Sequence, residues 1–430
     1  MNHPTSAPLP DGFAPAGRIR WQIPAALFVS VIISYLDRNN LSLALPKIAE
    51  EFGWTAEQQG KYDMILFIAF FFSYGLANLL FSPFGEKYGP KQSITIAVIC
   101  FSIFTILGGV VGQILPLFIV TRVLLGLGEG VHFPMNSKIT KSWFPVQERS
   151  RANGMWIAGV MAAVILGPLI LVPLTDYFGW RAMFVALGIL SMAVTLPLLK
   201  LFVYNTPREH PRIGEAELNY IEAGMERDEA EGETFWQQIR PILKSGPFWV
   251  ALTAGILNNA ASYGLMFWLP SYFVEGRGLD YKHLAWATSL PYVFGVAGIA
   301  LWSWLGDKLQ KRAFLAGAGY LITAVIAYFA ANASGLVLTI VLFSIAVLFQ
   351  SAYTSQEFAI LQRIIPKQVV GAGSGFYNGV AMMVGGVLGN SIVGGVVAAT
   401  GDMKSGIVAL LSTALLAGVA TLVLSRLIKY

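Results

Sequence analysis

Long apolar segments recur along the whole chain and constrain its fold more than any other feature. Of the 430 residues, 55% are apolar and 12% are charged, whereas soluble domains carry about 25% charged residues. Lipid must therefore solvate much of the apolar surface. A backbone in hydrocarbon must satisfy its own hydrogen bonds, and a helix of about 20 residues does so across a bilayer. The pattern predicts an all-α membrane protein.

We expect twelve transmembrane helices. They lie near residues 22–45, 60–83, 92–111, 114–137, 151–174, 179–203, 247–274, 284–305, 312–331, 335–360, 369–399 and 403–427.

The longest polar stretch, residues 204–246, separates the sixth helix from the seventh. We therefore predict an N-terminal tail over 1–21, one six-helix bundle over 22–203 and a second over 247–430. Leu218, Ile221 and Met225 recur at helical spacing in the polar stretch. We expect a surface helix there, within a solvated tether between the two bundles.

Lys and Arg residues are unevenly divided between the two sets of connections. One set contains Lys87, Lys91, Lys138 and Lys141, and the opposite set is poorer in positive charge. Positively charged connections stay on the cytoplasmic side. We therefore predict that both termini are cytoplasmic, in the inner or plasma membrane of the cell.

The two predicted bundles match at a constant offset of 221 residues. Gly85 corresponds to Gly306, Lys91 to Arg312 and Gly154 to Gly375. One shift that relates several motifs in the same order indicates a parallel repeat, related by an axis along the membrane normal. In such folds the solute site lies near the midplane, between the repeats.

Four ionisable residues lie inside apolar segments of the first bundle: Asp37, Arg38, Arg122 and Glu129. An intramembrane charge costs about 2.5–3.5 kcal/mol on insertion scales and usually marks an ion or solute pathway. The offset carries them onto Asn258, Asn259, Phe343 and Gln350. We infer that the first bundle handles ions and solute charge, and that the second supplies neutral hydrogen bonds.

Residues 85–91, Gly-Glu-Lys-Tyr-Gly-Pro-Lys, and their repeat from Gly306 resemble the loop signature of the major facilitator superfamily. Glu86 and Ser82 depart from it, where Asp and Gly are usual. Residues 35–40 and 122–134 further resemble the anion:cation symporter family. That resemblance implies twelve helices in two pseudo-symmetric bundles and uptake of sugar acids or related organic anions with protons.

The resemblance also suggests site residues. Arg122 and Glu129 are seven residues apart, so they share a helix face, and Gly126, Gly128 and Gly130 permit close approach there. Asp37 and Glu129 are the predicted proton carriers. The predicted solute-binding residues are Arg38, Arg122, Tyr74, Gln350, Asn378 and Glu357.

Asp37 and Arg38 suggest a coupling mechanism. Burial favours a protonated carboxyl group, and a nearby arginine favours the ionised form. Solute binding to Arg38 would therefore allow Asp37 to take up a proton.

His132 is either a proton relay or a packing residue. Several aromatic residues are candidates for closing the cavity: Tyr35, Trp156, Tyr263, Trp268 and Tyr292.

Charged residues at the loop signature and its repeat are predicted to gate the cytoplasmic side by bracing helix ends and parting when that side opens. They are Glu86, Lys87, Lys91, Asp307, Lys308 and Arg312.

Other function classes find no support in the sequence. The basic residues are dispersed, which argues against nucleic acid, and Cys100 is the single cysteine. No Walker A loop or zinc-protease motif occurs, so we expect neither an enzyme nor a cofactor or metal. The expected partners are the bilayer, a small organic anion and protons, and we expect a monomer.

Several alternatives remain open. The solute could be a phosphonate, a phosphate ester or an amine-bearing anion, and Glu357 is the residue that favours these classes. Sodium could replace protons, since carboxylates bind both ions. A channel or a transport-like receptor would not need titratable carboxylates facing an alternating cavity.

Overall fold

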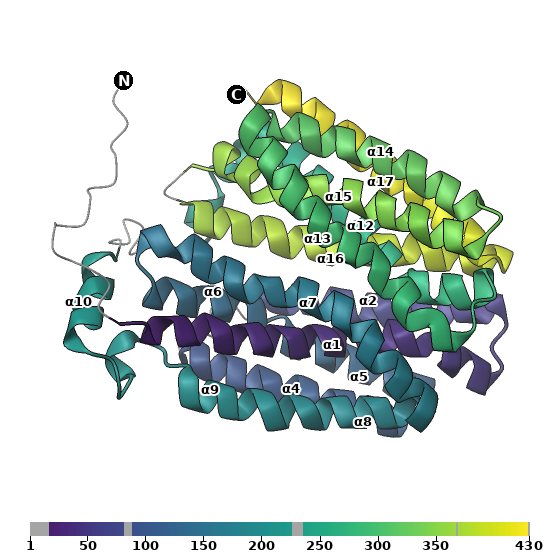
Figure 1. The fold of residues 1–430 in the computed structure, drawn as a ribbon, viewed down its shortest axis with the longest axis horizontal. Coiled ribbons are helices and arrows are strands. Elements are labelled where there is room, and N and C mark those ends of the chain that lie inside the picture. Colours follow the sequence, from purple (N-terminus) through teal and green to yellow (C-terminus); the bar gives the residue numbers. More distant parts are fainter. Residues whose placement is uncertain (1–16, 81–87, 226–234, 367–368, 429–430) are drawn as a thin grey trace.

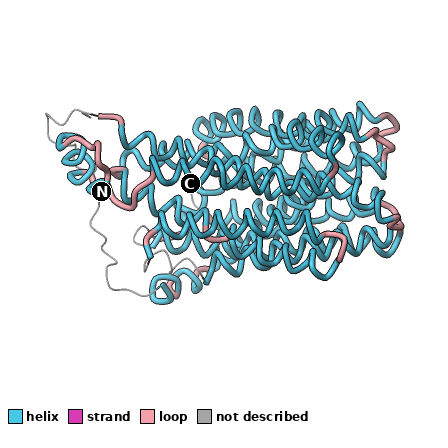
Figure 2. The backbone as a smooth tube through the Cα atoms, turned by 90° about the horizontal axis from the view of Figure 1, so that it is seen from below, coloured by secondary structure: helices cyan, strands magenta, loops and turns pink. Residues whose placement is uncertain are grey.

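The structure is a computed structural model, and it describes residues 17–80, 88–225, 235–366 and 369–428. The described chain is helical, with short connections at the two ends of a bundle of roughly parallel helices (Figure 2). Eleven of the described helical segments are long and apolar enough to cross a membrane. The protein is therefore a multi-pass membrane protein.

The first six spans form one bundle, coloured purple to teal in Figure 1. They are α1 (Gln22–Phe52), α2 (Ala56–Leu80), α4 (Pro90–Val111), α5 (Leu115–Glu129) with α6 (His132–Trp143), α7 (Val146–Phe178), and α8 (Trp180–Leu190), which continues through a π-helical segment, η2 (Ser191–Thr195), into α9 (Leu196–Phe202).

The second bundle is coloured green to yellow in Figure 1. Its helices are α12 (Gly246–Ser271) with the π-helical segment η5 (Tyr272–Gly276), the short 3-10 helix η6 (Tyr281–His283), α13 (Leu284–Leu309), α14 (Arg312–Asn332), α15 (Leu336–Ile364), α16 (Val370–Thr400) and α17 (Met403–Leu427). Helix α12 is not among these eleven, but its 26 residues are long enough to cross, and it carries Asn258 and Asn259 in its middle. With α12 counted as a span, the predicted twelve-helix, two-bundle fold is confirmed.

The start of α1 and the end of α17 lie at the same end of the molecule (Figure 1). We call this the near end, and we call the opposite end, at the α1–α2 connection, the far end. At the far end, α1 terminates at Gly53 in the left-handed region (φ 61°), which glycine adopts at little cost. Asp402 caps α17 there by accepting hydrogen bonds from the backbone N–H groups of Lys404 and Ser405.

Large apolar side chains cover the outer surface along the spans, as Phe72, Ile96 and Tyr328 illustrate with more than half of their surface exposed. Polar side chains are buried between the helices instead. Such a distribution suits a hydrocarbon surrounding, because lipid solvates the apolar side chains and helix neighbours satisfy the polar ones.

The segment between the bundles is not simply a solvated tether. Its helix α10 (Glu215–Ala223) is attached to the near end of the first bundle, because Glu217 is 1% exposed and pairs with Arg20 at 2.9 Å. Arg20 also pairs with Glu148 at 2.8 Å, and Tyr220 donates a hydrogen bond to Glu148. The predicted apolar face of α10 therefore accounts for only part of its attachment, because a buried ion-pair network also holds the helix.

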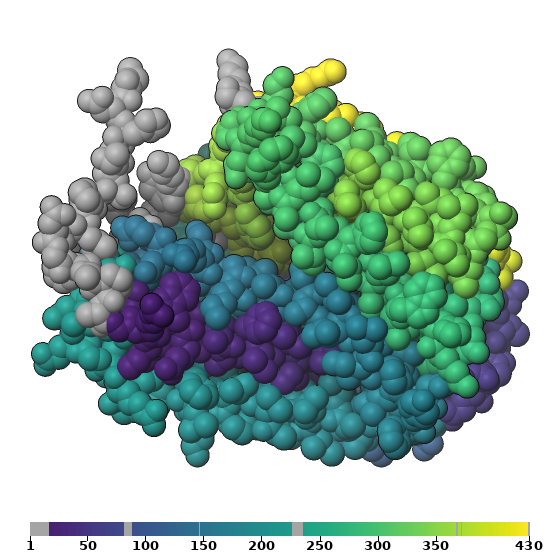
Figure 3. All heavy atoms as spheres, viewed as in Figure 1, coloured from purple at the N-terminus to yellow at the C-terminus, as the bar shows by residue number. Residues whose placement is uncertain are grey.

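Hydrogen bonds between described residues join the two bundles toward the far end. Gln59 donates to Glu275 (2.8 Å), the Tyr281 hydroxyl donates to the carbonyl of Leu43 (2.7 Å), and Ser289 donates to the carbonyl of Ile165 (2.8 Å). Helices α2 and α16 also pack closely along their length, from Gly60 at the far end to Gly379 toward the near end. In the view of Figure 3, the surface is hollowed between the two bundles toward the near end of the molecule.

Candidate functional site

The four ionisable residues predicted in the first bundle form one buried cluster. Asp37, Arg38, Arg122 and Glu129 are each at most 3% exposed. Helix α1 supplies the first two and α5 the last two. The helix geometry therefore brings together the residues that the sequence singled out.

The ion pair in this cluster joins Arg38 to Glu129. The Arg38 Nε and Nη2 atoms donate to the same oxygen, Glu129 Oε2, at 3.0 and 2.9 Å. Arg38 Nη1 and Glu129 Oε1 have no hydrogen-bond partner among the described residues. One donor of Arg38 and one acceptor of Glu129 are therefore left unused by the ion pair.

Asp37 is held apart from both arginines. Its carboxylate accepts hydrogen bonds from the Thr105 hydroxyl, at 2.7 and 2.6 Å to the two oxygens, and from the Asn40 side chain at 2.9 Å. Arg122 reaches the other end of the same Asn40 amide at 3.3 Å. Sequence reasoning missed Thr105 and Asn40, because neutral polar residues in a span give no signal of their partner.

Arg122 lies against aromatic rings rather than against Glu129. Its guanidinium is 5.0 Å from the Phe118 ring centroid and 4.8 Å from that of Phe184. Arg122 and Glu129 share a face of α5, as their spacing predicts, but Glu129 reaches across to α1. The tertiary packing, rather than the seven-residue spacing, selects the ion pair.

Glycines on α5 place Tyr74 beside this cluster. A Cβ atom on Gly126 would lie 2.2 Å from Ser73 Oγ, and one on Gly130 would lie 2.4 Å from the Tyr74 carbonyl oxygen. Helix α2 therefore approaches closely, as the glycine run predicted. The Arg38 guanidinium then stacks 4.4 Å from the Tyr74 ring and 4.3 Å from the Tyr35 ring.

The aromatic shell continues into the second bundle. Tyr263 on α12 approaches Tyr35 and Arg38, and its ring lies 4.9 Å from Phe71 on α2. Arg38 therefore lies at the junction between the bundles. Two other residues predicted to close the cavity hydrogen-bond to their neighbours: Trp156 to Thr140 and Asn153, and Trp268 to Asn390.

Polar residues of the second bundle form a separate hydrogen-bonded chain. Gln350 donates to Ser262 at 2.7 Å and to the Tyr320 hydroxyl at 3.4 Å, and Tyr320 donates to Asn258. Gln350 is thus hydrogen-bonded within its own bundle.

Glu357 ends a second polar chain. Its carboxylate accepts a hydrogen bond from the Tyr377 hydroxyl at 2.8 Å, and Tyr377 contacts the Tyr353 hydroxyl at 3.0 Å. Glu357 and Asn378 are half-buried, unlike the cluster in the first bundle.

His132 is a packed residue in this structure. Its Nε2 atom lies 2.9 Å from the Ser30 hydroxyl, its ring packs against Phe101, and it is 1% exposed.

The predicted gating residues divide between described and undescribed segments. Glu86 and Lys87 lie outside the described residues. Arg312 pairs with Asp307 at 2.6 Å and donates to Gln356 at 2.8 Å. Lys91 donates from its backbone to Asn205 and stacks on Tyr204 at 4.3 Å, while Lys308 lies 5.1 Å from the Trp304 ring.

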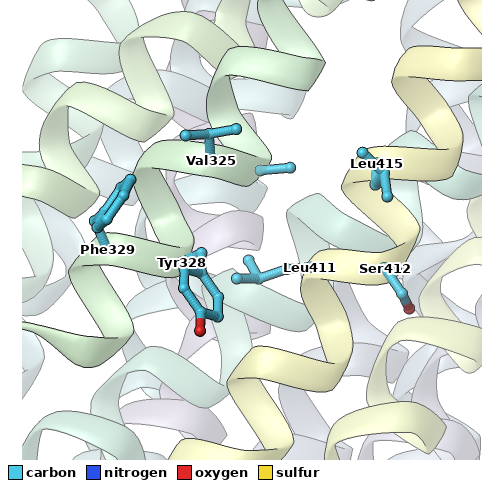
Figure 4. A pocket seen from close by; sticks show the side chains of 7 residues that line it. Val325, Tyr328, Phe329, Leu411, Ser412 and Leu415 are labelled. Atoms are coloured by element: carbon cyan, nitrogen blue, oxygen red, sulfur yellow. The ribbon is translucent and has the colours of Figure 1, made fainter.

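A surface pocket between α14 and α17 contains none of the predicted residues (Figure 4). It is lined mainly by apolar side chains, including Val325, Phe329 and Leu415, which are about half exposed. In a multi-pass protein this surface faces lipid, so we do not assign the solute to it.

The chain matches the family model described as Major Facilitator Superfamily over residues 27–390 and 283–428. It therefore belongs to this superfamily of membrane transporters and is not an enzyme.

Its relatives carry names of organic-anion transporters. The chain is 32% identical over 297 residues to a probable sulfoacetate transporter of Cupriavidus necator, covering 69% of this chain and 66% of that protein. It is 28% identical to a probable galactarate/D-glucarate transporter of Bacillus subtilis, covering 96% of this chain and 94% of that protein. A D-galactonate transporter of Escherichia coli is 25% identical, with 86% and 87% covered. These relatives are typical of the anion:cation symporter family, as the sequence predicted.

Solved structures show the same fold at low sequence identity. A bacterial homologue of the human lysosomal transporter Spinster, in an inward-facing and unoccupied conformation, matches with a TM-score of 0.78 at 16% identity, covering 96% of this chain and 98% of that chain. A D-xylose–proton symporter matches with a TM-score of 0.72 at 13% identity, covering 93% and 96%.

Proposed function

We propose that this transporter imports a small organic anion, of the sugar-acid class or a related carboxylate, in symport with protons by alternating access. The observation that carries the proposal is the buried Arg38–Glu129 ion pair, with a second buried carboxylate at Asp37 and a junction between the bundles beside it. Relatives named for galactarate, D-glucarate and D-galactonate support the solute class.

The geometry suggests how anion and proton binding are linked. A solute carboxylate that binds Arg38 competes with Glu129 for the same guanidinium. Glu129 then loses the charge that favours its ionised form, and burial favours its protonation. We expected Asp37 to take up a proton when the solute binds Arg38. The proposed exchange assigns that role to Glu129 instead, because Arg38 pairs with Glu129, whereas Asp37 accepts hydrogen bonds from neutral donors.

Asp37 is the second proposed proton carrier. If both carboxyl groups load in each cycle, at least two protons accompany each anion. A singly charged anion would then carry net positive charge inward, and a negative interior would accelerate uptake. Arg122 holds Asn40, and thereby positions Asp37, from the opposite side.

Reconstituted full-length protein in liposomes tests the proposal. Inward proton gradients should drive accumulation of D-galactonate, D-glucarate or sulfoacetate, and sodium gradients should not. Asp37→Asn and Glu129→Gln should abolish accumulation, while Asp37→Asn should retain anion counterflow. Glu50→Gln, at an exposed carboxylate paired with Lys47, is the matched control. Normal accumulation and stoichiometry in Asp37→Asn would refute the assignment of Asp37.

A second solute class is favoured by one observation. Glu357 presents a half-buried carboxylate on the second-bundle side of the junction, across from the arginine side. An anion that also carries an amine would contact both. Counterflow with amino-bearing and hydroxyl-only acids distinguishes these classes, since Glu357→Gln should weaken only the amine-bearing solute. Absence of saturable counterflow would instead indicate a channel or a receptor.

A further inference from the structure

Asp63 on α2 is a buried carboxyl group that the mechanism above does not use. It is 0% exposed, and neither carboxyl oxygen has a hydrogen-bond partner among the described residues. An isolated ionised carboxylate is very unfavourable in such a place, and a neutral carboxyl group is far less so. The packing around Asp63 therefore accommodates the protonated side chain.

Asp63 lies at the contact between the bundles. Residues 59, 63 and 67 share one face of α2 because they are one helical turn apart. On either side of Asp63, Gln59 donates to Glu275 at 2.8 Å, and the Phe67 ring lies 6.0 Å from that of Trp268. Both partners belong to the second bundle, so the contact of the bundles is what removes Asp63 from water.

Backbone approach makes this contact tight. A Cβ atom on Gly60 would lie 2.6 Å from the backbone nitrogen of Ala398, and one on Gly394 would lie 2.4 Å from Met64 Cβ. Asp63 follows Gly60 by one turn and precedes Met64, so little space is available for water. Separation of α2 from α16 would be needed to hydrate the carboxylate.

The charged groups around Asp63 do not supply a cation. Glu275, on the exposed rim of the contact, is itself acidic, and α16 contains no acidic or basic residue. Arg277 is bonded to Ala333 and Thr339. The remaining ionisable groups on α2 near this contact are Glu57, which lies beside Gly401 at the end of α16, Lys61, which is exposed, and Tyr62, against Trp54. On η5, Tyr272 is bonded to the Ala331 carbonyl, and Arg122 and Glu129 of α5 belong to the cluster in the first bundle.

We propose that Asp63 is a further proton-binding site, whose protonation permits the far ends of the bundles to close on one another. When the far end opens, water reaches Asp63 and it ionises. When the far end closes, Asp63 must carry a proton, because closure removes water and brings Glu275 alongside through Gln59. The exposed Glu275 carboxylate marks the side from which that proton arrives.

This inference rests on the proposed alternating-access cycle and adds a proton-dependent step to it. Protons supplied from the far side would load Asp63 before closure and thereby favour the inward step. The site is separate from the Arg38–Glu129 pair, because Asp63 acts through contact of the bundles and does not bind solute.

Distance measurements on full-length protein without solute test the proposal. Spin labels at Tyr177→Cys and Lys282→Cys, in a Cys100→Ser background, report the separation of the two bundles at the far end; Tyr177 is 80% exposed and Lys282 is exposed. In the parent, the long-distance population should increase between about pH 5 and about pH 8, a range that covers buried carboxyl groups. Asp63→Asn should keep the short distance throughout, and Glu50→Gln should behave as the parent.

Two outcomes would overturn the proposal: a parent distance that does not respond to pH, or an Asp63→Asn response equal to that of the parent. If Asp63→Asn does not yield monodisperse protein, Asp63→Leu is the uncharged replacement, with the same expectation. Transport is measured separately. Uptake with a pH-insensitive far end refutes only this inference, whereas a responsive far end without anion uptake refutes only the proposed function.

Discussion

At the scale of single residues, the first-bundle cluster depends on compensation between buried charges. Arg38 and Glu129 are at most 3% exposed, and each leaves a polar atom without a hydrogen-bond partner among the described residues. A fully buried pair of this kind is weakly stabilising at best, but removal of one partner leaves an uncompensated charge. The pair is therefore understandable as a device for exchange with a ligand rather than as a source of stability.

Single and double substitutions of this pair should differ in a characteristic way. Glu129→Gln should destabilise the protein by about 3–5 kcal/mol, because Arg38 stays charged and buried. The double variant Arg38→Met/Glu129→Gln should recover most of that loss. Thermal unfolding of the purified proteins measures the order of stability. Equal loss in the single and double variants would show that the two residues do not compensate each other.

At the scale of helices, glycines determine how closely the spans approach. Gly126 admits the Phe70 carbonyl oxygen and the Ser73 hydroxyl of α2, and Gly130 admits the Tyr74 carbonyl oxygen. Tyr74 and Phe70 then contact the Arg38 guanidinium. The glycine run in α5 thus determines the position of an arginine on α1 through a third helix, α2.

Gly126→Val should therefore impair both stability and transport. Its side chain would collide with the α2 backbone, and overpacking of this kind costs about 1–3 kcal/mol. Displacement of α2 should also raise the solute KM, because Tyr74 and Arg38 would no longer stack. The control is Gly154→Val on α7, where a Cβ atom meets nothing within 4 Å. Thermal unfolding and counterflow kinetics measure both effects, and normal kinetics in Gly126→Val would contradict this account.

At the scale of the whole molecule, the conformation depends on a few contacts between the bundles. The Tyr281 hydroxyl bonds the Leu43 carbonyl at the far end, and the buried parts of α2 and α16 pack beside it. Transport by alternating access requires such contacts to be of modest strength, since each must break in every cycle.

Tyr281→Phe should shift the population toward an open far end. Loss of one hydrogen bond costs about 1 kcal/mol, which corresponds to roughly a fivefold change in the ratio of the two states. The spin-label pair described above measures that ratio at low pH, and Tyr320→Phe, within the second bundle, serves as a control. An unchanged ratio in Tyr281→Phe would show that this bond does not hold the far end closed.

The amino-acid sequence by itself determined the spans, the two-bundle repeat and the identity of the four charged residues. These features are local, because hydrophobic length, glycine spacing and charge inside an apolar run can be read without knowing the neighbours. The position of the linker helix was only half predicted, since the buried partners of Glu217 are Arg20 and, through it, Glu148, far away in the sequence.

Only the tertiary structure decided how the polar residues pair. Arg38 and Glu129 are 91 residues apart, and the Thr105 hydroxyl that holds Asp37 lies 68 residues from it. Asp63 gave no signal at all, because one carboxylate near the end of a span looks like an interfacial residue until a second bundle covers it. Such pairings depend on how helices from distant parts of the chain pack, and the free energy of each depends on burial that exists only in the folded molecule.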